Sequence, residues 1–328
     1  MSETIVVFGG TGQLGSQVVK VFREAGYHVV APTRYEVDLY DAQKVSYFLA
    51  GMPENFSVIN CAGVVRGIGG QDHAMMLADN MAMGTNVCHA ANRLGAKYHL
   101  YASSSCVYPP SDKLLNEGSL MGNSMPSFDD SNRGYAFAKY AVMRLCFEFN
   151  LSKDIHTKNI TFVPPNLFSS EINLNEKFPH VIPDVIRKFK NAKKDEVVNL
   201  RGTGFVYREF LHVEDCARMI LRLYECASNI NTNTTVYNIP GYEETLIFDV
   251  IRAISKEFND HPFTFSGNPN EDGPRRKCMD QSRIFSLKGF YTSYSHNLYN
   301  TIPRLCRKAK YVNLNDPYSF KNNLNSRK

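Results

Sequence analysis

The sequence has no long apolar segment, no close cysteine pair and little excess charge. Its apolar runs are all shorter than the ~18–20 residues of a membrane-spanning helix, and the first run, Ile5–Phe8, lacks the basic flank of a secretory leader. None of the eight cysteines belongs to a Cys-x-x-Cys pair, so we expect no metal site, and free thiols in a reducing, cytoplasmic compartment. The net charge of +5 is too small to indicate nucleic acid, and neither a nucleic-acid nor a membrane partner is expected.

The composition is that of a globular protein, with 43% apolar and 21% charged residues in a chain of 328. In the first half, short apolar runs alternate with helix-like segments. This alternation predicts an α/β fold of the Rossmann type, a doubly wound parallel sheet with helices on both faces. The expected strands are Thr4–Phe8, His28–Ala31, Ser57–Asn60, Tyr98–Ser103 and Asn159–Val163. The expected helices are Gln13–Ala25, Asp41–Leu49, Ala74–Leu94 and Tyr135–Asn150.

The alternation loosens after Pro164, where we expect a second, smaller α/β domain interleaved with a returning piece of the first. The first domain is expected at 1–165 with a returning segment at about 205–242, the second at 166–204 and 243–315, and residues 316–328 as a frayed tail. Within these limits the expected elements are helices over 182–192, 213–227 and 244–258 and strands near 197–200 and 235–239.

A glycine-rich loop joins the first expected strand to the first expected helix. Gly9 permits a tight turn, Gly12 allows backbone to approach a pyrophosphate, and Gly15 allows helix and strand to pack closely. The unpaired N–H groups and the dipole of the helix then favour a diphosphate at its N-terminus. We therefore expect a dinucleotide cofactor, held by Gly9, Thr11, Gly12, Gln13, Leu14 and Gly15.

The end of the second expected strand favours NADP(H) over NAD(H). No acidic residue follows Ala31 directly, whereas Arg34 can bind a 2′-phosphate. In the alternative, Arg34 is a solvated surface residue and Glu36 or Asp38 binds the ribose. With Arg34 on the phosphate, Asp38 and Leu39 are expected to contact the adenine.

A serine, a tyrosine and a lysine are spaced as in a carbonyl reductase. Ser104 follows the fourth expected strand, at the edge where open α/β sheets bind ligands. Tyr135 and Lys139 are four residues apart and share one helix face, so we expect the ammonium to lower the pKa of the phenol. Tyr135 then exchanges a proton with a carbonyl or alcohol. In the alternative, both are ordinary surface residues.

These residues resemble the extended short-chain dehydrogenase/reductase family in its nucleotide-sugar branch, and more narrowly the GDP-L-fucose synthases. The resemblance runs from residue 5 to about 285. Besides the glycine loop and the Tyr-x-x-x-Lys pair, it rests on the stretches Ser104–Pro109, Pro165–Leu167, His180–Pro183, Ile186–Phe189, Gly202–Gly204, Arg208–Asp215 and Arg276–Asp280.

The resemblance implies a role for each matching residue. Reduction is assigned to Ser104, Tyr135 and Lys139, and epimerisation to Cys106 and His180. Tyr135, Lys139 and His180 are also expected at the cofactor, and the substrate residues are Asn166, Arg187, Lys188, Arg208 and Lys277. The implied reaction is the NADPH-dependent conversion of GDP-4-keto-6-deoxy-D-mannose to GDP-L-fucose, in a homodimer formed through two helices that are apolar on more than one face, 74–94 and 135–150.

Other interpretations stay open for several of these residues. From composition alone Cys106 is a buried thiol, although its position two residues after Ser104 places both on one side of an extended segment. His180 can instead be a loop residue or helix cap, Arg208 a surface charge, and His212 is expected to be structural.

The sequence also departs from the family on the substrate side. The departures are Val64 and Arg66 after the third strand and Phe168–Ser170 after the fifth, and they put the exact sugar in question. A related GDP-6-deoxy-4-keto-sugar, such as a heptose, is the first alternative. A non-catalytic dinucleotide-sensing regulator is the second.

Overall fold

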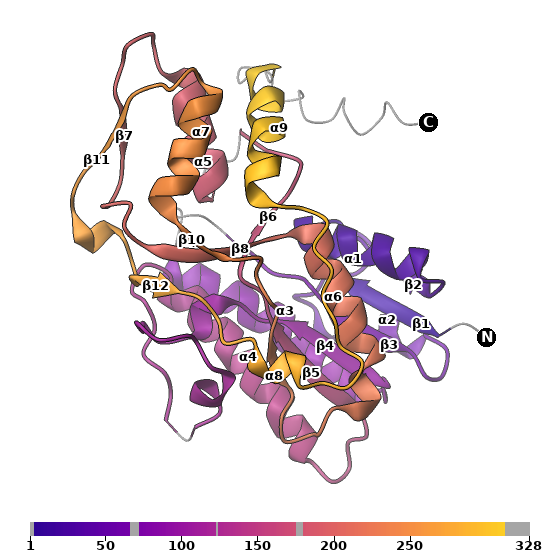
Figure 1. Cartoon of the computed structure of the whole chain (residues 1–328). Coiled ribbons are helices and arrows are strands. Elements are labelled where there is room, and N and C mark those ends of the chain that lie inside the picture. Colours follow the sequence, from indigo (N-terminus) through magenta and orange to yellow (C-terminus); the bar gives the residue numbers. More distant parts are fainter. Residues whose placement is uncertain (1–2, 66–71, 123, 175–179, 312–328) are drawn as a thin grey trace.

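A six-stranded parallel sheet lies at the centre of the molecule (Figure 1). The computed structural model describes residues 3–65, 72–122, 124–174 and 180–311. Neighbouring strands in the order β2-β1-β3-β4-β5-β9 are all parallel, which confirms the predicted Rossmann-type fold class. The strands are β1 (Thr4–Phe8), β2 (His28–Val30), β3 (Ser57–Asn60), β4 (Tyr98–Ala102), β5 (Lys158–Val163) and β9 (Val236–Asn238).

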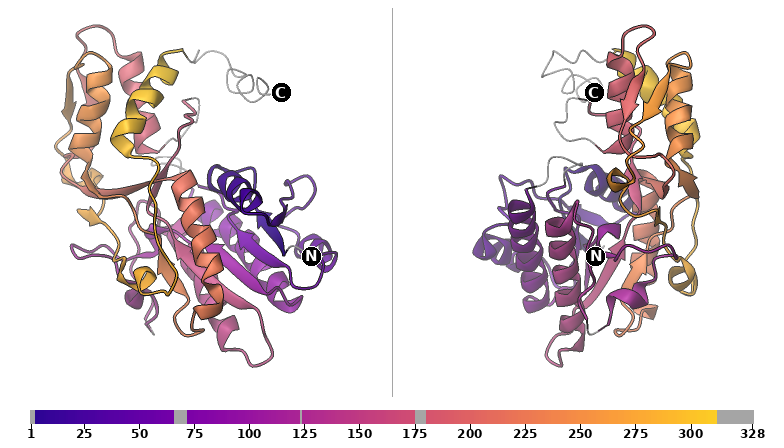
Figure 2. Two further views of the ribbon diagram at one scale, coloured as in Figure 1. Left: turned by 45° about the vertical axis from the view of Figure 1, so that its right-hand side comes forward. Right: turned by 90° about the vertical axis from the view of Figure 1, so that its left-hand side faces the viewer.

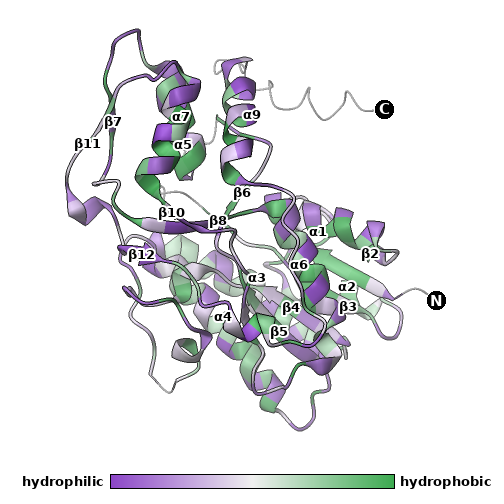
Figure 3. Ribbon diagram, viewed as in Figure 1, coloured by the Kyte–Doolittle hydropathy of each residue, from purple (hydrophilic) through white to green (hydrophobic). Residues whose placement is uncertain are grey.

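Helices cover both faces of this sheet because its strands are apolar on both sides. All five residues of β1 are buried: Ile5 and Val7 pack into the core under α1 and α6, and Val6 and Phe8 into the core under α2 and α3. The green colour of β1 in Figure 3 shows this continuous apolar run. The covering helices are α1 (Gln13–Glu24), α2 (Ala42–Ala50), α3 (His73–Arg93), α4 (Arg133–Leu151) and α6 (Val213–Glu225).

The strand order changes direction at β1, since β2 lies on one side of it and β3 on the other. In open α/β sheets such a reversal leaves a crevice at the carboxyl ends of the strands, where ligands bind. The loop after β1 and the loop after β3 meet at this edge, and the segments after β4 and β5 follow along it.

A second group of elements forms its own core away from the large sheet (Figures 1 and 2). It comprises α5 (Val181–Asn191), α7 (Ile247–Glu257), α9 (Leu298–Tyr311) and the parallel pair β7 (Val198–Leu200) and β11 (Phe263–Phe265). A small mixed sheet joins the two groups, with β8 (Tyr207–His212) paired to β6 (Asn166–Phe168), β10 (Glu244–Leu246) and β12 (Arg276–Lys277). The short helices are η1 (Ser105–Val107), η2 (Glu117–Leu120), η3 (Ala227–Asn229), η4 (Pro269–Glu271) and α8 (Ser282–Phe285).

The structure corrects one predicted element. The helix expected over 244–258 begins only at Ile247, because the three residues before it form β10. Glu244 pairs there with Glu209 of β8, and its carboxylate receives two hydrogen bonds from Arg276 at 2.7 and 2.8 Å. The domain limits stay a prediction, and the tail over 316–328 lies outside the described residues. Within the described ranges, no helix has the length and apolar character needed to cross a membrane.

Candidate active site

The loop after β1 and the first turn of α1 each have one position that accepts only glycine. Gly9 has a φ of 77°, and a Cβ there would lie 2.7–2.8 Å from the backbone of Cys61 and Ala62, just after β3. A Cβ at Gly15 would overlap the carbonyl oxygen of Gly9. That oxygen accepts a hydrogen bond from the Gly12 N–H at 2.9 Å, which closes the turn. Glycine thus lets β1, β3 and α1 meet at the reversal of the sheet.

The N-terminus of α1 suits a diphosphate. Among the described residues, no side chain caps this helix at Gly12, and its first turn carries no acidic residue. Thr11, Gly12 and Gln13 are exposed, while Leu14 is half-buried. Uncapped N–H groups at a positive helix end attract anions. The residues present therefore fit the pyrophosphate of a dinucleotide.

The segment after β2 places Arg34 in the open. Its side chain is exposed and donates a hydrogen bond to the Tyr35 hydroxyl at 3.3 Å. The carboxylate of Glu36 is engaged by the Thr33 N–H at 2.7 Å, and that of Asp38 by the Tyr40 N–H at 3.0 Å. The Leu39 carbonyl accepts from Asn86 at 2.9 Å. The exposed guanidinium of Arg34 is therefore open to an anionic group such as a 2′-phosphate. The carboxylates of Glu36 and Asp38, in contrast, already accept hydrogen bonds from the backbone of local turns.

Lys139 is buried between three elements. Only 4% of its surface is exposed, and its Nζ donates to the Ala102 carbonyl at the end of β4 at 2.9 Å. Nζ also lies 5.8 Å from the centre of the Tyr135 ring and 5.0 Å from that of Tyr101. A Cβ at Gly63, after β3, would lie 3.2 Å from Nζ. The lysine therefore links the Tyr135 helix to the loops at the sheet edge.

Tyr135 is 8% exposed, and its electrostatics differ from the prediction. Burial, reinforced by the charge on Cys106, raises the pKa of Tyr135, while a hydrogen bond with Ser104 opposes the rise. The expectation that Lys139 lowers this pKa is wrong in this structure, because the ammonium is turned to the Ala102 carbonyl. Burial also lowers the pKa of Lys139 itself, to about 8.

Cys106 is held between two nitrogen donors. Asn132, the residue before α4, donates from Nδ2 to its Sγ at 3.1 Å, and Lys277 of β12 donates from Nζ at 3.2 Å. The extended segment predicted for residues 104–106 is wrong: Cys106 lies in η1, and Ser104 caps that helix by accepting from the Cys106 N–H at 3.2 Å. The tight turn brings Cys106 close to Tyr135.

Arg208 lies beside Lys277 because β8 and β12 pair in parallel with these two residues in register. Its guanidinium donates to the carbonyls of Tyr207, Pro274 and Asp272 at 2.7–2.9 Å. These bonds fix the position of the positive charge. Burial lowers the pKa of Arg208, but a guanidinium stays protonated at any working pH.

The remaining predicted residues lie elsewhere. Asn166 donates to the Glu209 carbonyl at 2.9 Å, within the small mixed sheet. Arg187 and Lys188 of α5 form ion pairs with Asp184 at 2.8 and 3.2 Å, and His180 precedes this helix with an exposed side chain.

Sequence reasoning overlooked Asn132 and Asn80. Asn80 holds the loop after β3 by exchanging hydrogen bonds with both backbone groups of Val64, at 3.1 and 3.0 Å. Val64 is therefore held in place next to Gly63, the residue that faces Lys139 Nζ, whereas the other departure, Arg66, lies outside the described residues. The only signal for Asn132 was its place three residues before Tyr135. His212 is structural, as expected: it accepts from the Ser170 N–H at 3.1 Å and stacks on His296.

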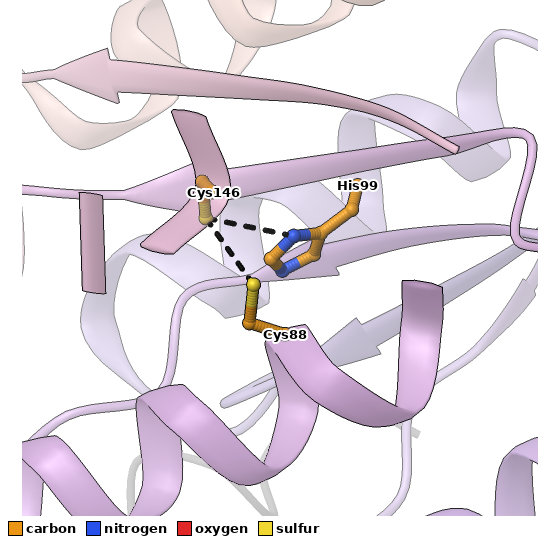
Figure 4. Close-up of side chains that lie close together, drawn as sticks. All are labelled: Cys88, His99 and Cys146. Carbon is orange, nitrogen blue, oxygen red and sulfur yellow. Dashed lines mark hydrogen bonds between the residues drawn. The ribbon is translucent and has the colours of Figure 1, made fainter. Parts of the chain in front are cut away.

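Cys88, His99 and Cys146 converge beneath the sheet from α3, β4 and α4 (Figure 4). The two sulfurs are 3.5 Å apart, and the Cys146 sulfur lies 3.8 Å from Nδ1 of His99. Nδ1 is also 2.9 Å from the Asn159 oxygen, which accepts a hydrogen bond from Asn92 and therefore requires the ring proton on Nδ1. Nδ1, which faces the Cys146 sulfur, therefore carries a proton, whereas Nε2 of His99 keeps its lone pair and is buried without a hydrogen-bond partner among the described residues.

Comparisons with known proteins agree with this geometry. Residues 5–239 match the model of the NAD dependent epimerase/dehydratase family. The chain is 30% identical over 297 residues to GDP-L-fucose synthase 1 of Arabidopsis thaliana, with 87% of each chain covered. It is also 30% identical over 324 residues to GDP-L-colitose synthase of Yersinia pseudotuberculosis, over 92% of this chain and 96% of the relative. The solved GDP-mannoheptose C4 reductase of Campylobacter jejuni with NADP bound shares the fold, with a TM-score of 0.80 at 22% identity over 94% of this chain and 98% of that one.

Proposed function

Because this chain belongs to the NAD dependent epimerase/dehydratase family, we propose that it is an NADPH-dependent epimerase-reductase that converts GDP-4-keto-6-deoxy-D-mannose to GDP-L-fucose. One observation carries the proposal: η1, which holds Cys106, packs against the start of α4, where Asn132 donates to the Cys106 sulfur at 3.1 Å three residues before Tyr135. An enzyme that inverts carbons beside a ketone and then reduces the ketone needs both a carbon base and a proton donor at one carbonyl.

The relatives support the nucleotide and the cofactor. GDP-sugar enzymes from a plant and a bacterium match along most of their length, and the Campylobacter reductase with the same fold holds NADP. In this chain Gly9 and Gly12 would hold the pyrophosphate, Arg34 the 2′-phosphate, and Asp38 and Leu39 the adenine. When bound, the reduced nicotinamide supplies a hydride to the C4 carbonyl carbon of the substrate.

The side chains divide the proton transfers between them. The C4 ketone makes the C3 and C5 hydrogens acidic, and Cys106 Sγ removes them as a thiolate. His180 returns a proton from the opposite face, which inverts each carbon. Tyr135 Oη then gives its proton to the C4 oxygen as reduction occurs, while the Ser104 hydroxyl binds the same oxygen. Lys139 keeps the Tyr135 helix against the end of β4.

The sugar nucleotide would lie between the two groups of elements. We assign the diphosphate and sugar to Arg208 and Lys277 on the small sheet, with Asn166, Arg187 and Lys188 beyond them. The second group, built on α5, α7 and α9, would then be the substrate domain. His180 and α5 would come into use when the substrate bridges the two groups.

The chain should form a dimer through α3 and α4. The two helices pack side by side, and Phe137, Leu145 and Phe147 on α4 and Met81 on α3 are only half-buried. A second copy packing there in a four-helix arrangement would cover these apolar groups. Light scattering at micromolar concentration should give the mass of two chains. A mass of one chain would contradict the dimer.

Replacing Arg34 by alanine should weaken NADPH use selectively. An exposed guanidinium bound to a phosphate forms charge-assisted hydrogen bonds, and their loss should raise the KM for NADPH roughly tenfold or more. The KM for NADH should change little because NADH lacks the 2′-phosphate. Steady-state kinetics with both cofactors check this, and an equal rise for both would remove Arg34 from the phosphate site.

The function itself is tested by the product. Incubation with GDP-4-keto-6-deoxymannose and NADPH should oxidise the cofactor and yield GDP-L-fucose, identified by NMR. A product reduced at C4 with C3 and C5 unchanged would instead make the chain a simple 4-ketoreductase of a related GDP-keto-sugar. This second candidate, the 4-ketoreductase, is favoured by Val64, which departs from the family on the substrate side and is held in place by Asn80. No NADPH oxidation with any such sugar would contradict both.

A further inference from the structure

We propose that Lys277 and Asn132 together hold the Cys106 sulfur as a thiolate, which makes both of them positioning residues for the carbon base. The inference rests on the function proposed above for Cys106. Lys277 would then stabilise the Cys106 thiolate in addition to binding the diphosphate or the sugar. Asn132, to which the proposed function assigns no role, would stabilise the same thiolate.

The contacts at the sulfur have the pattern of an anion site. Two nitrogens converge on Cys106 Sγ, Nδ2 of Asn132 at 3.1 Å and Nζ of Lys277 at 3.2 Å. An amide nitrogen and an ammonium only donate hydrogen bonds, so the sulfur accepts from both. A thiolate accepts such bonds far better than a thiol, and a neighbouring lysine favours the thiolate form.

The other charged groups near the sulfur do not replace Lys277. Tyr135 faces it from α4 as a neutral phenol whose pKa the sulfur's charge raises. Arg208 faces the sulfur from β8, but its guanidinium donates hydrogen bonds to three backbone carbonyls. The nearby carboxylates of Asp272 and Asp129 also interact with its positive charge. Lys277 therefore supplies the one positive charge among the described residues that contacts this sulfur directly.

The strand β12 explains why Lys277 points at the sulfur. Successive residues of a strand face opposite sides. Arg276 points to Glu244, which binds it through two hydrogen bonds at 2.7 and 2.8 Å, so Lys277 faces the other side. The Tyr207 N–H also anchors the segment through the Arg275 carbonyl at 2.9 Å. The geometry of β12 therefore directs the Lys277 side chain toward the Cys106 sulfur.

The position of Asn132 is fixed by the start of α4. It precedes the first turn of α4, yet among the described residues its side chain caps no N–H of that helix. Its amide is turned to the Cys106 sulfur, 26 residues away in sequence, and the helix start thereby fixes the sulfur relative to Tyr135. An asparagine at this position normally stabilises its own helix, so its use here points to a role at the sulfur.

The test measures thiol reactivity on the full chain without substrate. The rate of iodoacetamide addition at Cys106, followed by mass spectrometry of its peptide, is recorded against pH. We expect the midpoint of this profile to lie below that of free cysteine measured in parallel. Lys277→Met should move the midpoint up by about one unit or more, and Lys277→Arg should restore most of the difference.

Two further variants complete the test. Asn132→Asp places a carboxylate against the sulfur and should also move the midpoint up, while an aspartate at the start of α4 favours the helix and hence folding. Arg276→Met removes the neighbouring charge that faces away and should leave the midpoint unchanged. The proposal is overturned if Lys277→Met and Asn132→Asp follow the parent profile, or if the parent follows free cysteine.

The test of the thiolate assignment can fail or succeed independently of the test of the proposed function. A low midpoint that depends on Lys277, together with no turnover of any GDP-keto-sugar, would contradict the proposed function and leave the thiolate assignment standing. Normal turnover with a profile insensitive to Lys277 and Asn132 would contradict only the thiolate assignment.

Discussion

Replacing Cys106 by serine should abolish deuterium uptake at C3 and C5 of the 4-keto sugar in heavy water. A hydroxyl is a far weaker acid than a thiol, so Asn132 and Lys277 would have no anion to hold near neutral pH. Loss of a positioned general base typically costs 10²–10⁴-fold, and we expect exchange to fall by about that factor. NMR of the substrate incubated without NADPH measures the exchange directly.

A second cysteine provides the control for this variant. Cys226 is buried under the opposite face of the sheet and donates to the Lys288 carbonyl at 3.5 Å, a bond that a serine hydroxyl can also make. Cys226→Ser should therefore exchange as the parent does. Exchange at the parent rate in Cys106→Ser would make Cys106 a packed bystander and the chain a 4-ketoreductase.

The strands of the large sheet were predictable because they are buried on both faces. Such strands read as continuous apolar runs, and β1 and β3 have the predicted limits. In the second group, the sequence predicts a helix where β10 lies, because a three-residue strand has too few residues to show its own period. The helix α9 was not predicted, and Pro303 in its interior is a residue that normally ends a helix.

In the candidate site, too, the features set by local sequence were predictable and those set by tertiary packing were not. Spacing alone was sufficient to place Tyr135 and Lys139 on one helix face, but not to show that both are buried, and burial decides the direction of their pKa shifts. The contact between Asn132 and Cys106 depends on how α4 packs against η1, which local sequence does not encode. The pairing of Lys277 with Arg208 likewise joins strands that are far apart in the chain.

Replacing Tyr135 by phenylalanine should produce the opposite defect to Cys106→Ser: NADPH oxidation falls by about 10²–10⁴-fold while exchange at C3 and C5 continues. The ring stays in place, and only the hydroxyl bonded to Ser104 is lost. Since burial raises the pKa of Tyr135, the phenol is protonated across the neutral range, and the proton donor is lost only as pH rises above that pKa. Tyr140→Phe is the matched control, because Tyr140 lies on the same helix with the same 8% exposure and should reduce the ketone normally. Reduction by Tyr135→Phe at the parent rate would show that another group protonates the C4 oxygen.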